Sequence, residues 1–169
     1  MTLSLDQAWK VLGAVLDPEI PAITITDLGI VRDLIQDGGD FKVVITPTYS
    51  GCPATEFIER GIRTALLEAG AQSVTLEIQL SPAWTTDWLN PDAREKLRQY
   101  GIAPPSCFTQ VSTKKEQVIQ FMPRKKDVME CPRCNSINNE RLSEFGATAC
   151  KALYRCLDCR EPFEYFKPI

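Results

Sequence analysis

Four cysteines near the C-terminus form two C-x-x-C pairs, a pattern typical of thiolate-bound metal ions. The pairs are Cys131-Pro132-Arg133-Cys134 and Cys156-Leu157-Asp158-Cys159, and 21 residues separate them, slightly more than at most zinc sites with this motif. Two thiolates on each tight turn can bind one shared ion at about 2.3 Å, and the two turns together complete a tetrahedron. We therefore predict a structural Zn²⁺ site with no ligand position open to water or substrate.

The spacing leaves both the metal and the exact ligand set open. An iron ion bound by the same four sulfurs has the same geometry, so spacing alone does not separate it from zinc. Cys150 is close enough in sequence to replace one of the four ligands, although a buried free thiol is the commoner role, and Cys107 is also left over. Asn135 and Arg160 follow the two pairs at positions where the backbone often takes positive φ, which asparagine tolerates better than arginine.

A cysteine in the first half of the chain is the best candidate for chemistry outside this cluster. Cys52 lies in Tyr49-Ser50-Gly51-Cys52-Pro53, where a predicted strand gives way to a helix. We predict that Cys52 is the N-cap and Pro53 the first helical residue, a position where the helix dipole favours a reactive thiolate. Three acidic residues in irregular segments can approach the same end of the sheet: Asp17, Glu19 and Asp27. The alternative is a partly buried cysteine in a tight turn, with the acids as turn formers.

Local patterns predict the elements that position these groups. Ser4 and Gln7 form a capping-box pattern, and the apolar periodicity after them predicts a helix that ends near Asp17-Pro18. Two β-branched runs, 30–36 and 41–45, flank Asp37-Gly38-Gly39-Asp40 and predict a hairpin. A helix over 53–69 and a strand over 74–80 with one buried face follow. Asn90 as N-cap and Gly101 as the stop signal predict a last short helix.

This order predicts an α+β fold: a small two-layer α/β domain with a mixed sheet over residues 1–102. Residues 103–127 are predicted to be a partly extended linker, with a strand at 117–122. Residues 128–169 contain too few apolar side chains for an independent core, so bound metal must supply much of their stability. We therefore expect a β-rich zinc ribbon there.

The absence of histidine from all 169 residues limits the possible chemistry. It excludes Ser-His and Cys-His nucleophilic sites, the two-histidine iron triad and the Glu-x-x-His pairs of helical di-iron proteins. The chain therefore cannot be an oxygenase of the di-iron class, and we expect no catalytic turnover of its own.

The charge distribution and the lack of export signals predict the partners and the compartment. Residues 1–102 carry 14 acidic and 8 basic side chains, whereas 103–127 carry 5 basic and 2 acidic ones. An acidic main domain repels a phosphate backbone, so we expect no nucleic-acid partner. We see no signal peptide and no apolar run long enough for a membrane span, which predicts a cytoplasmic protein with reduced thiols.

Three signatures in the first 100 residues resemble the metal-sulfur cluster biosynthesis (MIP18-like) domain. They are Asp17-Pro18-Glu19-Ile20-Pro21, Asp27-Leu28-Gly29-Ile30-Val31, and Thr48 followed four residues later by Cys52-Pro53. Residues 81–88 (SPAWTTDW) and 145–156 (FGATACKALYRC) are similar to one branch, the D subunits of bacterial phenylacetyl-CoA epoxidase systems. Ser50 departs from the proline usual in the wider family, and Pro168 stands where many D subunits have a cysteine.

The resemblance implies an accessory protein that assists the maturation or assembly of a metal centre in the epoxidase. Its expected partners are the other epoxidase subunits, especially the iron-sulfur reductase or the di-iron oxygenase. It also implies a set of residues that handle iron or an iron-sulfur cluster transiently: Cys52, Asp17, Glu19, Asp27 and Thr48. A homodimer is the default expectation.

Three other functions remain as alternatives. A stoichiometric docking component of the epoxidase would use Trp84, Trp88 and Tyr100 as an aromatic contact surface, although the same residues also suit core packing. A zinc ribbon that binds nucleic acid has only the net basic 103–127 segment in its favour. A thiol oxidoreductase is disfavoured because both C-x-x-C pairs are used for zinc, which leaves Cys52 without an obvious resolving cysteine.

Overall fold

The computed structural model describes residues 3–105 and 129–168. Its elements are α1 (Leu5–Leu12), β1 (Val31–Asp37), β2 (Asp40–Ile45), α2 (Thr55–Glu68), β3 (Ser73–Ile78), the 3₁₀ turn η1 (Thr86–Trp88), α3 (Pro91–Tyr100), β4 (Ile102–Ala103), β5 (Asn139–Ser143), β6 (Lys151–Cys156) and β7 (Pro162–Phe166). The predicted order of helices and strands over the first 102 residues is confirmed. The predicted strand at 117–122 and Cys107 lie outside the described residues.

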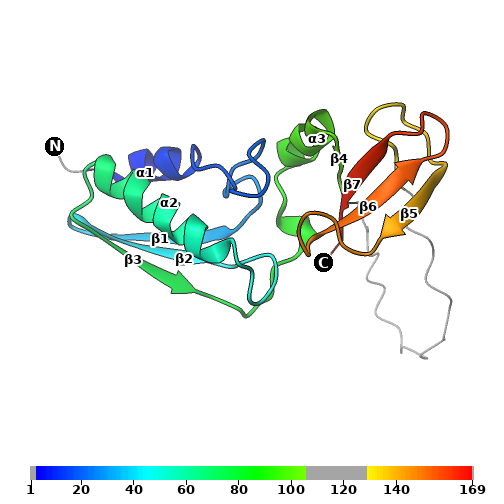
Figure 1. Cartoon of the computed structure of the whole chain (residues 1–169). Coiled ribbons are helices and arrows are strands. Elements are labelled where there is room, and N and C mark those ends of the chain that lie inside the picture. Colours follow the sequence, from blue (N-terminus) through cyan, green and yellow to red (C-terminus); the bar gives the residue numbers. More distant parts are fainter. Residues whose placement is uncertain (1–2, 106–128, 169) are drawn as a thin grey trace, which may run out of the picture.

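The N-terminal part is a helical layer on a three-stranded mixed sheet (Figure 1). β1 and β2 are antiparallel and meet at the Gly38-Gly39 turn, whereas β2 and β3 are parallel and are joined through α2. Both α1 and α2 lie on the same face of this sheet (Figure 1). The core of this part includes the buried side chains of Leu12, Leu34, Phe41, Ile62 and Leu66. The predicted α+β class with a mixed sheet is confirmed.

The first helix is shorter than the apolar periodicity predicts. The capping box of Ser4 and Gln7 is present, but α1 ends at Leu12 with Gly13 as its C-cap, not near Asp17-Pro18. The backbone beyond it forms different hydrogen bonds: Ile25 N–H donates to the carbonyl oxygen of Val15 at 3.0 Å. This short antiparallel bridge replaces further helical turns and leads the chain towards β1.

The second helix also begins later than predicted, and this moves Cys52 out of the N-cap. α2 starts at Thr55, and its N-cap is Ala54, which makes no side-chain capping bond. Residues 52–54 form a tight turn instead, closed by the Thr55 N–H, which donates to the Cys52 carbonyl oxygen at 3.1 Å. The prediction that Pro53 opens the helix was therefore wrong, and Cys52 lies in the turn before it.

The predicted buried face of the third strand is only partly present. Val74 is buried, but Ile78 is 47% exposed and Leu80, beyond the strand, is 57% exposed. β3 is an edge strand of the order β1-β2-β3, so it has a neighbour on one side only. Regular alternation in sequence did not reveal that the outer end of this strand lacks a covering layer.

The C-terminal part is a four-stranded sheet in the order β4-β7-β6-β5. β4, which directly follows α3, pairs in parallel with β7, so the expected boundary between residues 102 and 103 falls within a strand of this sheet. A small second core packs here: Ala103, Met129, Cys131, Cys156, Phe163 and Tyr165. The expectation of a β-rich C-terminal part is confirmed.

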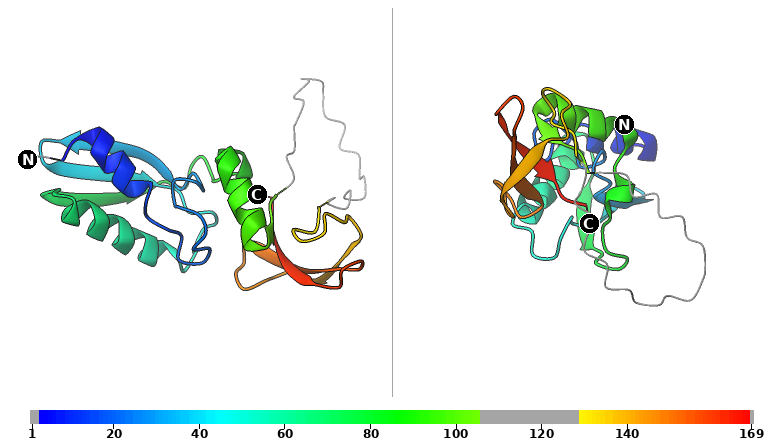
Figure 2. Two further views of the ribbon diagram at one scale, coloured as in Figure 1. Left: turned by 90° about the horizontal axis from the view of Figure 1, so that it is seen from above. Right: turned by 90° about the vertical axis from the view of Figure 1, so that its right-hand side faces the viewer.

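The two parts share a packed junction beside α3, which lies between them in two views (Figures 1 and 2). Phe166 at the end of β7 is 1% exposed and belongs to the core of the N-terminal part, as does Cys150. Trp84 is 2% exposed, and Trp88 lies beneath the guanidinium of Arg32, 3.5 Å from its ring centroid. The aromatic contact surface suggested for Trp84, Trp88 and Tyr100 is therefore not formed, because Trp84 is a core residue.

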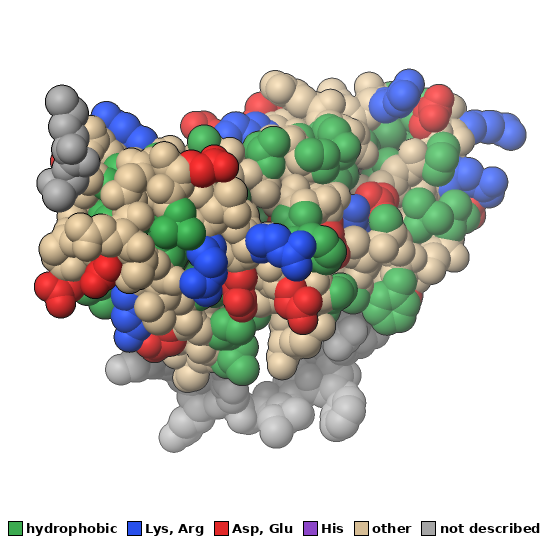
Figure 3. Space-filling model, turned by 60° about the vertical axis from the view of Figure 1, so that its left-hand side comes forward, with side chains coloured by type: hydrophobic (Ala, Val, Ile, Leu, Met, Phe, Trp, Pro, Cys, Tyr) green, Lys and Arg blue, Asp and Glu red, His purple; other side chains and the backbone are tan. Residues whose placement is uncertain are grey.

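The surface and the helix lengths add two further observations. On the face shown in Figure 3, acidic and basic side chains are interspersed with small groups of hydrophobic ones. Within residues 3–105 and 129–168, no helix has the length and apolar character that crossing a membrane requires.

Candidate functional site

The structure brings the four cysteines of the two C-x-x-C pairs into one cluster. Their sulfurs all lie within 4.8 Å of one another, and within the described ranges no other group of cysteines and acids meets this criterion. The Sγ atoms of Cys131 and Cys159 are 3.8 Å apart, and those of Cys134 and Cys156 are 3.5 Å apart. Sulfurs bound at about 2.3 Å to one tetrahedral ion are separated by roughly 3.8 Å. The donor set therefore fits one metal ion that prefers four thiolates, which is zinc or iron.

The backbone of the two turns favours the thiolate form that a metal requires. Asn135 and Arg160 take φ values of 61° and 64°, so the expected positive φ occurs after both pairs, although neither residue is glycine. Backbone N–H groups of Cys159 and Asp158 point at the sulfur of Cys156 and lower the pKa of this thiol to about 7.

A carboxylate connects the two turns to each other. Asp158, between Cys156 and Cys159, accepts hydrogen bonds from the Ser136 hydroxyl and, at 2.9 Å, from the Asn138 amide. These two bonds lower the pKa of Asp158. The second pair is thereby held in register with the residues that follow the first pair.

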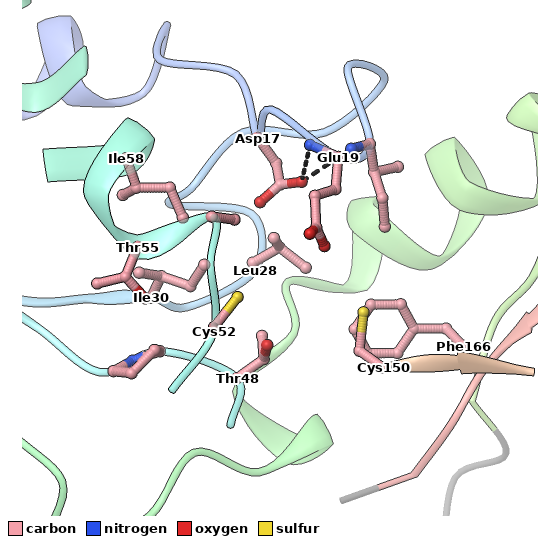
Figure 4. Close-up of a pocket in the computed structure, with 13 residues that line it drawn as sticks. Asp17, Glu19, Leu28, Ile30, Thr48, Cys52, Thr55, Ile58, Cys150 and Phe166 are labelled. Atoms are coloured by element: carbon pink, nitrogen blue, oxygen red, sulfur yellow. Dashed lines mark hydrogen bonds between the residues drawn. The ribbon is translucent and has the colours of Figure 1, made fainter. Parts of the chain in front are cut away.

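A second candidate site is a small pocket of about 20 Å³ at the junction of the two parts (Figure 4). Among the residues that line it are Asp17, Glu19, Thr48, Cys52, Cys150 and Phe166. Four of the five residues predicted to handle iron therefore share one pocket, and Asp27 does not line it. The last two lining residues come from the C-terminal part, and the sequence did not predict them.

Two carboxylates of the first signature face this pocket. Oδ1 of Asp17 accepts the backbone N–H groups of Glu19 at 2.9 Å and Ile20 at 2.8 Å, drawn as dashed lines in Figure 4. Burial raises the pKa of Asp17 despite these bonds. Burial also raises the pKa of Glu19, and the neighbouring charge of Asp17 adds to this effect. The pocket therefore contains two acids whose ionised forms lack a fully compensating cation.

Asp27 has a different role, at the junction with α3. Its carboxylate accepts a hydrogen bond from Lys96 at 2.7 Å and from the backbone N–H of Thr24 at 3.1 Å. Burial works to raise the pKa of Asp27, but the bonds from Lys96 and Thr24 outweigh it and lower the pKa. Asp27 thus holds α3 against the loop before β1 and is a structural member of the second signature.

Each thiol of the pocket has a hydroxyl partner. The Tyr49 hydroxyl hydrogen-bonds to Cys52, and the Thr148 hydroxyl lies 3.0 Å from the sulfur of Cys150. Burial raises the pKa of Cys150, and the charges of Glu19 and Cys52 add to the increase. The sequence left Cys52 without a neighbouring thiol, but the structure places Cys150 in the same pocket. Only the resemblance over 145–156 drew attention to this segment.

Comparisons with known proteins match the two parts separately. Residues 5–78 match the family model of an iron-sulfur cluster assembly protein, and residues 115–167 match that of the PaaD zinc beta ribbon domain. The solved structure of a DUF59 domain from Bacillus anthracis matches with a TM-score of 0.51 at 24% identity, and covers 54% of this chain and 89% of that structure. This likeness supports the fold of the N-terminal part.

Three relatives cover one or both parts. A protein of Porphyromonas gingivalis (strain ATCC BAA-308 / W83) named Fe-S protein maturation auxiliary factor is 30% identical over 52% of this chain and 85% of its own length. The Fe-S protein maturation auxiliary factor SufT of Staphylococcus aureus (strain USA300) is 35% identical over 49% of this chain and 96% of its own length. The D subunit of 1,2-phenylacetyl-CoA epoxidase of Escherichia coli (strain K12) is 50% identical over 96% of this chain and 92% of its own length. The chain belongs to the family of phenylacetyl-CoA epoxidase D subunits, in which an iron-sulfur cluster assembly domain precedes a zinc beta ribbon.

Proposed function

We propose that this protein is an accessory factor of a phenylacetyl-CoA epoxidase system, without catalytic turnover of its own. It assists the maturation or assembly of a metal centre in the iron-sulfur or di-iron component. The names of its relatives support this assignment, because one is an epoxidase subunit and two are Fe-S maturation factors. The observation that carries it is the junction pocket, where Cys52 of the assembly domain lies with Asp17 and Glu19.

In this proposal the ribbon cysteines hold a structural Zn²⁺: Cys131, Cys134, Cys156 and Cys159. Four thiolates fill its tetrahedral shell, so the ion supplies folding free energy rather than catalysis, on the order of 10–16 kcal/mol. The folded ribbon then presents Cys150 and Phe166 to the pocket.

The pocket binds iron or a cluster as cargo for a client protein. The Cys52 thiolate is the principal ligand, and the Tyr49 hydroxyl bonded to it stabilises the ionised sulfur. Asp17 fixes the backbone of the turn that carries Glu19. Asp27, through Lys96, keeps α3 and the second signature in place.

The test is the metal content of the epoxidase components in a host that lacks its native counterpart of this protein. With wild-type protein supplied, each component is purified anaerobically and its iron and acid-labile sulfide are measured. Cys52→Ser should leave at least one component deficient in iron, whereas Ser50→Ala, an exposed neighbour in the same turn, should restore it fully. Unchanged iron and sulfide in every component with Cys52→Ser would reject the proposal.

A further inference from the structure

Two thiols from opposite parts of the chain line the junction pocket, and one carboxylate lies beside them (Figure 4). We propose that Cys52, Cys150 and Glu19 form a second metal site, which takes a single thiophilic divalent ion, Fe²⁺ in the cell, rather than a preassembled cluster. The inference rests on the proposed function and specifies its cargo. It also gives the ribbon a direct part in binding, because the ribbon supplies one ligand.

The position of Cys150 is fixed by the core. Its side chain is 5% exposed and packs in the core of the N-terminal part, and the backbone N–H of Lys167 donates to its carbonyl oxygen at 2.9 Å. Cys52 lies opposite, in the turn before α2, and both residues border the same cavity. Two separately folded segments thus present thiols to one small space.

Thr148 connects the ribbon thiol to the carboxylate of the first signature. Its hydroxyl lies 3.0 Å from the Cys150 sulfur and also hydrogen-bonds to Glu19. One hydroxyl can accept from the thiol and donate to the carboxylate at the same time. Glu19 and Cys150 are therefore held close together across the junction, which is the arrangement that a shared ion needs.

The charges of the pocket favour a cation. Ionised forms of Glu19, Asp17 and Cys150 are all disfavoured by burial, which raises the pKa of each group. The nearby ammonium of Lys151 is paired with Glu164 at 2.7 Å. A divalent ion would stabilise the ionised forms, and each thiol would release one proton to solvent on binding, with no electron transfer.

The size of the pocket favours one ion. A volume of about 20 Å³ has room for one water-sized particle, whereas a cluster contains several iron and sulfur atoms. In contrast to the ribbon cysteines, these ligand atoms do not all lie within 4.8 Å of one another. The site therefore closes by side-chain rotation, which suits an exchangeable cargo better than a permanent structural ion.

The test uses the full chain, reduced and anaerobic, with its ribbon saturated by zinc, and titrates it with Co²⁺ as a coloured probe for divalent ions. Wild-type protein should bind one further ion with a thiolate-to-cobalt charge-transfer band. Cys52→Ser and Cys150→Ser should each lower the affinity at least about tenfold and weaken the band. Glu19→Gln should lower the affinity but keep the band, and Glu68→Gln, an exposed carboxylate at the end of α2, should change neither.

The zinc content of each variant reports whether the ribbon is intact. A Cys150→Ser variant that keeps zinc and binds Co²⁺ like wild type, while Cys52→Ser does not, would overturn this inference and leave the proposed function standing. Wild-type behaviour of both variants would count against metal handling by the pocket altogether. X-ray absorption at the cobalt edge of the wild-type protein needs no variant: two sulfur ligands support the site, and one or none refutes it.

Discussion

The indole of Trp84 and the phenyl ring of Phe166 lie 6.0 Å apart at an interplanar angle of 57°, and they join the two parts of the chain. The Trp84 N–H also donates to the carbonyl oxygen of Leu28 at 2.8 Å. Leu28 belongs to the second signature and lines the junction pocket, as does Phe166. The last strand of the ribbon therefore ends within the core that supports the pocket.

Truncation of this aromatic contact should destabilise both parts together. Phe166 is 1% exposed, and replacement of a buried phenylalanine by alanine costs about 3–5 kcal/mol. We expect Phe166→Ala to lower the free energy of unfolding by this amount, measured by urea denaturation with zinc present. Phe57→Ala is the matched control, because Phe57 is 60% exposed and should cost no more than about 1 kcal/mol. Equal effects of the two variants would contradict the shared core.

Loss of a ribbon cysteine should remove one zinc ion and unfold the ribbon strands. The small second core contains only six buried residues, two of them cysteines of the cluster, so it cannot replace the folding free energy of the metal. In Cys134→Ser we expect the backbone amides of β5, β6 and β7 to lose protection from hydrogen exchange. Cys52→Ser should retain both its zinc and this protection. Protected ribbon amides in a zinc-free variant would show that the metal is dispensable for folding.

Gly29 of the second signature has a structural role that its neighbour in the motif, Asp27, shares. Its φ is +67°, and an added Cβ would lie 2.5 Å from the carbonyl oxygen of Trp88. Gly51, beside Cys52, has a φ of +79° with nothing within 4 Å of an added Cβ. Gly51→Ala should cost about 1–2 kcal/mol from backbone strain alone, whereas Gly29→Ala should cost about 1–3 kcal/mol more because of the overlap. Thermal unfolding of both variants compares them, and similar shifts would contradict the close approach of Gly29 to Trp88.

Elements with strong local signals were predictable from the sequence. The capping box at Ser4, the Gly38-Gly39 hairpin and the Asn90 and Gly101 ends of α3 each depend on residues within one turn of the chain. The two C-x-x-C pairs are also local, which is why the ribbon cluster was predicted with its four residues. By contrast, the end of α1, the exposed end of β3 and the start of α2 depend on what packs or pairs with them.

The junction pocket was only half predictable, for a related reason. Asp17, Glu19, Thr48 and Cys52 belong to motifs of one domain, but Cys150 reaches them through the pairing of β7 with β4 and the burial of Phe166. No local pattern around Cys150 encodes that long-range packing. Asp27 was grouped with the pocket because it belongs to the same set of motifs, whereas its hydrogen bond to Lys96 requires the placement of α3.

Asp17 and Asp27 should respond in opposite directions when their charge is removed. The pKa of Asp17 is raised above its usual value of 3.8, so the folded state binds its proton more tightly and stability falls as the pH rises through the folded pKa. The pKa of Asp27 is lowered, so its contribution is present above the unfolded value and is lost only as the pH falls through the folded pKa. At neutral pH the ionised Asp17 is therefore destabilising, and the ionised Asp27 is stabilising.

Near neutral pH, Asp17→Asn should raise the free energy of unfolding, because asparagine keeps an oxygen that can accept the N–H groups of Glu19 and Ile20 without a buried charge. Asp27→Asn should lower it by about 1.5–3 kcal/mol, the usual value of a hydrogen bond to a charged group. Urea denaturation at about pH 7 and about pH 5 measures both, and the gain from Asp17→Asn should shrink at the lower pH as the wild-type carboxyl takes up its proton. A loss of stability in both variants at neutral pH would mean that the carboxylate of Asp17 is compensated by cations within the protein. The pocket would then have no unbalanced negative charge to attract a metal ion.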